Sequence, residues 1–184
     1  MIFDKPIRFS RKVRSKYLQP LGRLLLKHKL TANHFTSFSL ILGLLGAYFL
    51  FQNNWLFALF IVLHLIADSL DGVLARLSKP TLFGEYFDKV TDQLIAFLLL
   101  LKIYIYLNDY YALIMLSLFV LTYLVYFGSK MTYPCIFVRT GVVITLFFFP
   151  LWPNFITNGT FLVVGGFMIY SLIQQLRFFL ATRI

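Results

Sequence analysis

The chain has 184 residues, of which 60% are hydrophobic and 13% are charged, and its formal net charge at pH 7 is +10. A soluble domain of this length has too little interior to bury that much apolar surface, so the composition excludes an ordinary soluble protein. The single cysteine also excludes an internal disulfide. We expect residues 1–184 to form a single membrane domain.

The N-terminal segment, residues 1–30, carries nine of the seventeen lysines and arginines of the chain. Positive charge concentrated next to apolar residues is typical of a segment that lies on an anionic membrane, so we expect no nucleic-acid partner. The apolar side chains recur at helical spacing, at Tyr17, Leu18, Leu21, Leu24 and Leu25. We therefore predict a cytoplasmic interfacial helix, broken or restarted at Pro20.

Six apolar stretches follow, each about long enough to cross the roughly 30 Å of bilayer hydrocarbon as a helix. We predict spans near 34–51, 55–76, 85–107, 110–128, 136–152 and 160–180. The fifth is short and ends among Pro150, Trp152 and Pro153. The predicted fold is an all-α integral membrane protein, with six transmembrane helices over 34–180 preceded by the interfacial helix.

Basic residues at the ends of these spans predict the orientation of the chain. The loops 52–54 and 153–159 contain no lysine or arginine. The opposite ends of the spans carry Arg76, Lys79, Lys130, Arg139, Arg177 and Arg183, and Lys102 is the exception to the pattern. By the positive-inside rule, the basic ends face the cytoplasm, so we expect both termini and the active site there.

Five of the seven acidic residues of the chain lie close together, at Asp68, Asp71, Glu85, Asp88 and Asp92. A carboxylate inside the membrane is costly unless it is paired, hydrated or bound to a metal. Asp68 and Asp71 share a face of the second span, and Asp88 and Asp92 share a face of the third. A short loop, 77–83, joins these spans, so we expect the four aspartates to meet in the cytoplasmic third of the membrane.

Four oxygen ligands without a cysteine favour Mg²⁺, Mn²⁺ or Ca²⁺ over zinc. Four carboxylates suit two ions, and two ions suit displacement at phosphorus because they neutralise a diphosphate and its leaving group. The small residues Gly72, Ala75 and Gly84 would let a nucleotide approach the backbone closely. Arg76 is well placed to meet the phosphates of that nucleotide.

The same residues form two motifs along the chain. Asp68-Ser-Leu-Asp71-Gly72-Val-Leu-Ala75-Arg76 is followed by Gly84-Glu-Tyr-Phe-Asp88-Lys-Val-Thr-Asp92. This pattern resembles the signature of the CDP-alcohol phosphotransferase family, D-x2-D-G-x2-A-R, a spacer, then G-x3-D-x3-D, at all eight fixed positions. The spacer of seven residues is shorter than the family usually has. The segment 30–36 also resembles the start of the family's first span, with Ala32 where proline is common.

The resemblance implies an activity and a role for each residue. A phosphatidyl-type group would pass from CDP-diacylglycerol or CDP-archaeol to an alcohol, with release of CMP, in a phospholipid-synthesising homodimer with two Mg²⁺ or Mn²⁺ ions per site. The implied metal ligands are Asp68, Asp71, Asp88 and Asp92, with Asp92 also the general base on the acceptor hydroxyl. The residues implied to surround the CDP group are Gly72, Ala75, Arg76 and Gly84.

The acceptor alcohol is less sharply indicated. Lys130, Arg139 and Arg177 all lie near predicted cytoplasmic ends. They either converge beside the metals and bind a polyol phosphate, such as inositol phosphate or glycerol phosphate, or are ordinary positive-inside charges. Serine, inositol, choline or ethanolamine remain alternative acceptors. His64, one turn before Asp68, either tunes the site or hydrogen-bonds a carboxylate, or it is a packed polar residue bonded to a neighbouring helix.

Two other classes of function remain open. A cation transporter would also place acidic residues inside the membrane, but along a path to both faces. Here the predicted spans four to six contain no acidic residue. An inactive homologue that serves as a membrane partner is the second alternative, and the intact set of aspartates argues against it.

Overall fold

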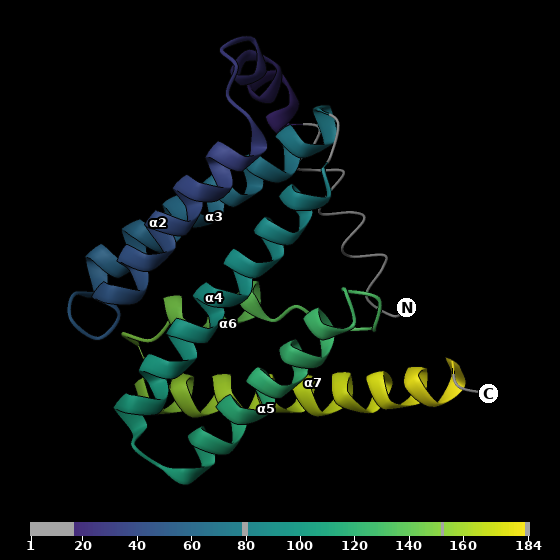
Figure 1. Cartoon of the computed structure of the whole chain (residues 1–184). Helices are drawn as coiled ribbons and strands as arrows, with labels where there is room; N and C mark the ends of the chain where they lie inside the picture. Colours follow the sequence, from purple (N-terminus) through teal and green to yellow (C-terminus); the bar gives the residue numbers. More distant parts are fainter. Residues whose placement is uncertain (1–16, 79–80, 152, 183–184) are drawn as a thin grey trace. The chain divides into compact units, whose positions relative to one another are not determined.

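The computed structural model describes residues 17–78, 81–151 and 153–182, and all regular structure in these ranges is helical. The chain divides into two compact units, Met1–Asp92 and Gln93–Ile184, and each is described by itself. Figure 1 shows the helices in chain order. The all-helical prediction is therefore confirmed for the described residues.

The first unit is built on a hairpin of two helices, α2 (Ala32–Phe49) and α3 (Asn54–Leu77), which lie side by side (Figure 1). Asn53 starts α3, because its side chain accepts hydrogen bonds from the backbone N–H groups of Trp55 and Leu56. A Cβ atom at Gly46 would lie 3.0 Å from the Ile61 side chain. Glycine at this position therefore allows the two helices to pack closely.

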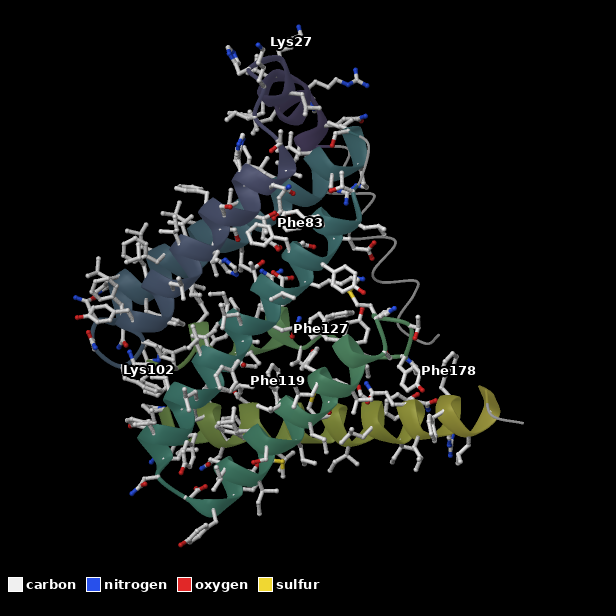
Figure 2. All side chains as sticks on the ribbon, viewed as in Figure 1. Lys27, Phe83, Lys102, Phe119, Phe127 and Phe178 are labelled. Atoms are coloured by element: carbon white, nitrogen blue, oxygen red, sulfur yellow. The ribbon has the colours of Figure 1, made fainter. Side chains whose placement is uncertain are left out.

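A shorter helix, Tyr17–Lys27, precedes α2 and is bent by 109° from it. The described part of this helix contains Pro20 without a break. Gly22 is buried, and a Cβ atom there would lie 2.9 Å from the Leu77 side chain of α3. Its opposite face is open: Tyr17 and Leu24 are exposed, and Lys27 ends the helix (Figure 2).

The helix α4 (Leu82–Leu107) begins in the first unit and continues into the second. Thr81 caps its start, because the hydroxyl of Thr81 accepts a hydrogen bond from the N–H of Gly84 at 3.0 Å. In the second unit, Asp109 caps α5 (Tyr110–Gly128) by accepting from the N–H of Ala112 at 2.7 Å. Each of these capping residues fixes where a helix begins, so the chain reverses at defined places.

The last helix, α7 (Pro153–Thr182), packs against α5. The side chain of Met115 fills the place that a Cβ atom at Gly165 would need. The predicted loop 153–159 is wrong, because α7 already begins at Pro153. Proline is well suited to the first position of a helix, where the missing N–H is not required.

The fifth predicted span, 136–152, differs most from the structure. Its helix, α6 (Arg139–Phe147), has nine residues, about 14 Å at the usual rise, which is too short to cross a bilayer. Residues 134–138 before it have no regular secondary structure. The Tyr123 hydroxyl donates to the carbonyl of Ile136 at 2.9 Å, and the N–H of Ile136 donates to Ser171 at 3.1 Å. Pro134 disfavours helix in the residue before it, and these side chains satisfy the backbone that results.

Four helices of the described residues are long and apolar enough to cross a membrane, namely α3, α4, α5 and α7. A fifth span is counted only if Tyr17–Lys27 and α2 are taken together as one bent segment. The prediction of a multi-pass membrane protein therefore agrees with the structure, whereas six spans are not confirmed.

Candidate metal and nucleotide site

Three of the four predicted aspartates come together in the first unit. Asp68 lies on α3, and Asp88 and Asp92 lie on α4. One carboxylate oxygen from each lies within 4.8 Å of the others, and all three side chains are partly buried. Asp88 and Asp92 share a helix face because they are four residues apart, and the short connection from α3 to α4 brings Asp68 to them.

Asp71 is not part of this group. It is 4% exposed, on the same helix as Asp68 and one turn nearer its end. The sequence predicted four aspartates in one cluster. The structure brings together three, with the fourth buried at the next turn.

The group of three fits a divalent cation. All the donors are carboxylate oxygens, which Mg²⁺ and Mn²⁺ prefer. Oxygens on opposite sides of one such ion are about 4 Å apart, since each lies about 2 Å from it. Two carboxylates at 4.8 Å repel each other by roughly 3–4 kcal/mol at an effective dielectric constant of about 20. A cation among them would offset that repulsion.

Beside the aspartates, the last turns of α3 carry Gly72, Ala75 and Arg76. Arg76 is exposed, and its Nη1 would lie 3.5 Å from a Cβ atom at Gly72, an ordinary contact distance. Gly72 therefore leaves open space on its own side of α3, next to a guanidinium group. The approach of a phosphate group to Arg76 stays a prediction.

Gly84 has a different setting from the one expected. A Cβ atom at this position would lie 3.0 Å from Oδ1 of Asn33 and 3.1 Å from Oγ1 of Thr81. The space beside Gly84 thus holds polar side chains from the starts of α2 and α4. The sequence predicted no site role for Asn33 or Thr81, although Asn33 belongs to the segment 30–36 that resembles the family.

An ion pair lies next to the aspartates on α4. Lys89 bonds to Glu85 at 2.6 Å, one turn apart on the helix surface. Such partly exposed pairs contribute little to stability. The ammonium group of Lys89 is thus paired with Glu85, although Lys89 is next to Asp88 in the sequence.

The three basic residues predicted to bind the acceptor all belong to the second unit. Arg139 is 6% exposed and is the first residue of α6. Lys130 is exposed in the turn after α5, at a positive φ of 53°, and Arg177 is exposed on α7. The three differ in burial, so their convergence on one ligand stays a prediction.

The fold and the carboxylate group fit a class of protein: a multi-pass α-helical membrane protein with a group of carboxylates on its helices that could hold a cation. Residues 29–174 match the family model described as CDP-alcohol phosphatidyltransferase. Since that match covers most of the chain, the chain belongs to the CDP-alcohol phosphatidyltransferase family.

Two curated relatives are similar to part of the chain. An uncharacterized protein of Aquifex aeolicus is 40% identical over 78 residues, which cover 41% of this chain and 40% of that protein. Archaetidylinositol phosphate synthase of Pyrococcus horikoshii is 35% identical over 88 residues, covering 45% of this chain and 47% of that protein. The chain thus spans less than half the length of either relative, and no solved structure matches it significantly.

Proposed function

We propose that this protein transfers a phosphatidyl-type group from a CDP-linked lipid, CDP-diacylglycerol or CDP-archaeol, to an alcohol and releases CMP. The observation that carries the proposal is the group of Asp68, Asp88 and Asp92, whose oxygens lie within 4.8 Å of one another. All three belong to the signature of the family to which the chain belongs. Family membership and geometry thus point to the same residues.

Asp92 is the proposed catalytic residue. Its carboxylate takes the proton of the acceptor hydroxyl, the alcohol oxygen forms a bond to the lipid-bearing phosphorus, and the bond from that phosphorus to CMP breaks. Arg76 binds the diphosphate beside the small residues Gly72 and Ala75, and Gly84 belongs to the same CDP site. The acceptor's proton stays on Asp92 until water removes it, so atoms and charge balance.

The proposed ligands of two Mg²⁺ or Mn²⁺ ions are Asp68, Asp71, Asp88 and Asp92. Bound there, the ions would supply positive charge to the diphosphate and to the leaving CMP. The buried position of Asp71 one turn from Asp68 is compatible with a second ion beside the first. Mg²⁺ and Mn²⁺ share these ligand preferences, so the proposal covers both.

The proposed acceptor is a polyol phosphate such as inositol phosphate or glycerol phosphate. Partial similarity to archaetidylinositol phosphate synthase supports an inositol phosphate. Arg139 supports an anionic acceptor, because a buried guanidinium and the start of a helix both favour a negative charge. Lys130 and Arg177 are the other proposed contacts with the acceptor's phosphate.

We also propose six membrane crossings, with residues 1–30 on the cytoplasmic interface and both termini and the active site in the cytoplasm. The alternation of basic and non-basic loops fits this topology only if the short α6 and its flanking residues count as one crossing. The exposed apolar face of Tyr17–Lys27 supports an interfacial position for that helix. A homodimer is proposed on family membership alone.

The test is CMP release by the purified protein from CDP-diacylglycerol or CDP-archaeol with Mg²⁺ or Mn²⁺. A panel of inositol phosphate, glycerol phosphate, serine, inositol, choline and ethanolamine identifies the acceptor. We expect release with a polyol phosphate and loss of release with EDTA. No release with any acceptor would contradict the proposal, and ion flux through the protein in sealed vesicles would favour a cation transporter instead.

A further inference from the structure

A buried pair of polar residues, Ser39 and His64, joins α2 to α3 inside the first unit. Ser39 and His64 are 4% and 1% exposed, respectively. The Nδ1 atom of His64 lies 2.8 Å from the Ser39 hydroxyl oxygen and 2.9 Å from the Ser39 carbonyl oxygen. His64 is thus bonded to a neighbouring helix, which was one of the alternatives that the sequence left open.

These contacts determine which ring nitrogen carries a proton. A carbonyl oxygen can only accept, so Nδ1 must be the donor in its 2.9 Å contact with Ser39. The Ser39 hydroxyl donates to the carbonyl oxygen of His64 at 3.2 Å, which leaves a lone pair on that hydroxyl for Nδ1. One N–H group at Nδ1 therefore bonds to both oxygens of Ser39, and the ring orientation is fixed.

The pair lies one helical turn from the metal site. His64 and Asp68 are four residues apart on α3, about 6 Å along the axis and about 40° around it. His64 itself does not belong to the carboxylate group. Close packing between Gly46 and Ile61, three residues before His64, holds the same stretch of α3 against α2. The position of α3 is therefore constrained immediately next to Asp68.

Asp68 is the one member of the group of three that comes from α3, since Asp88 and Asp92 are both on α4. If α3 rotated or shifted, the carboxylate of Asp68 would move away from both Asp88 and Asp92. Binding sites need their ligands held within about 0.5 Å of the productive position. A cation shared by α3 and α4 requires Asp68 to stay in place, and the contacts between α2 and α3 next to Asp68 limit its movement.

We propose that the Ser39–His64 pair is a positioning pair that holds Asp68 in register with Asp88 and Asp92 for cation binding. This inference rests on the proposed function of the aspartates. His64 acts through its Nδ1–H group, which fixes α3 on α2, and does not itself bind the metal or the substrates. The requirement on α2 is the backbone carbonyl of Ser39, which accepts from Nδ1.

The role of a single ring nitrogen can be tested by substitution. In His64→Asn, the side-chain nitrogen can occupy the place of Nδ1, because both atoms are attached to Cγ. In His64→Leu, the apolar volume is kept and the donor is lost. Ser39→Ala removes the hydroxyl and keeps the carbonyl oxygen that accepts from Nδ1. The matched control is His28→Leu, at an exposed histidine outside the helix bundle.

The first measurement is Mn²⁺ binding to the full-length protein in lipid nanodiscs by electron paramagnetic resonance, without substrates. We expect the Kd for Mn²⁺ to rise about tenfold in His64→Leu and to stay within about twofold of wild type in His64→Asn, Ser39→Ala and His28→Leu. Unchanged binding in His64→Leu would overturn the inference, as would equal losses in His64→Asn and His64→Leu. Absence of Mn²⁺ binding in the wild type would instead overturn the proposed function, and the inference with it.

A second measurement needs no variant that must fold. Nitrogen-15 magnetic resonance of the wild type, with histidine labelled, distinguishes protonated from unprotonated ring nitrogens. We expect the buried histidine to carry its proton on Nδ1 and to show a Nδ1–H bonded to oxygen. A neutral ring with its proton on the other nitrogen would overturn the inference.

Discussion

The two units of the molecule differ in the charge that they bury. The first unit contains the aspartates 68, 71, 88 and 92 on the helices α3 and α4. The second unit contains no acidic residue after Asp109, and Arg139 is buried there. Carboxylates inside the first unit favour the binding of a cation, whereas a buried guanidinium in the second unit favours the binding of an anion.

The units also differ in how they satisfy their backbone. In the first unit the described chain is helical except at short capped turns, and the aspartates lie on regular helices. In the second unit the irregular segment 134–138 before α6 is hydrogen-bonded by the side chains of Tyr123 and Ser171. Ligands on regular helices are held precisely, whereas an irregular segment depends on a few side chains for its hydrogen bonds. We therefore expect substitutions in the first unit to lower turnover, and substitutions in the second unit to weaken acceptor binding or stability.

The largest effect is expected at Asp92. Asp92→Asn should lower kcat for CMP release by about 10²- to 10⁴-fold, because the amide cannot accept the proton of the acceptor. Binding of the CDP-linked lipid, measured by equilibrium titration, should change far less. Asp109→Asn is the control, since asparagine caps a helix as well as aspartate does. Normal turnover in Asp92→Asn would remove Asp92 from its role as the base.

The next effect should appear in the second unit, at Arg139. Arg139→Gln should raise the KM for a phosphorylated acceptor by about 10- to 100-fold, because a charge-assisted hydrogen bond is lost. Arg139→Lys should have an intermediate effect, since lysine keeps the charge without the planar fork. The KM for the CDP-linked lipid serves as the internal control. Equal increases in both constants would show a general structural role instead.

A stability effect should distinguish two adjacent glycines of α7. Gly165→Val should lower the free energy of unfolding by about 1–3 kcal/mol, because the added side chain needs the space that Met115 occupies. Gly166→Val is the matched control, since a Cβ atom there meets nothing within 4 Å. Thermal unfolding in detergent measures both. Equal melting temperatures would contradict the packing of α7 on α5 described above.

The smallest effect concerns the one cysteine, Cys135, in the irregular segment before α6. Burial raises the pKa of the Cys135 thiol to about 12, so the thiolate is scarce at neutral pH and increases as the pH rises toward that value. Maleimide labelling at pH 7.5, followed by mass spectrometry, should be at least about tenfold slower than for Thr132→Cys in a Cys135→Ala background. Equal rates would mean that the segment opens readily.

The sequence predicted α3, α4 and α5 closely, because long apolar runs end at polar caps such as Asn53 and Asp109. It predicted a helix over 136–152, where the described residues form the helix α6 only from Arg139 to Phe147. Hydropathy measures how apolar a segment is, but not whether prolines and hydrogen bonds with Tyr123 and Ser171 make it irregular. Tertiary contacts that join residues far apart in the sequence left no local signal.

The candidate site was predictable in its residues more than in its arrangement. Helical spacing placed Asp88 and Asp92 on one face, and the short connection brought Asp68 to them. The sequence did not reveal that Asp71 lies outside the group of three aspartates or that Asn33 lies beside Gly84. Both depend on how much each helix is rotated about its axis, which packing with neighbouring helices determines.

The central claim is that aspartates from α3 and α4 bind the same divalent cation. Crystals of the protein grown with Mn²⁺ and measured near the manganese absorption edge would show each bound ion as an anomalous peak. We predict a peak within coordination distance of carboxylate oxygens of Asp68, Asp88 and Asp92, absent from crystals of Asp88→Asn. Manganese bound elsewhere, or carboxylates on α3 and α4 that share no ion, would contradict the account.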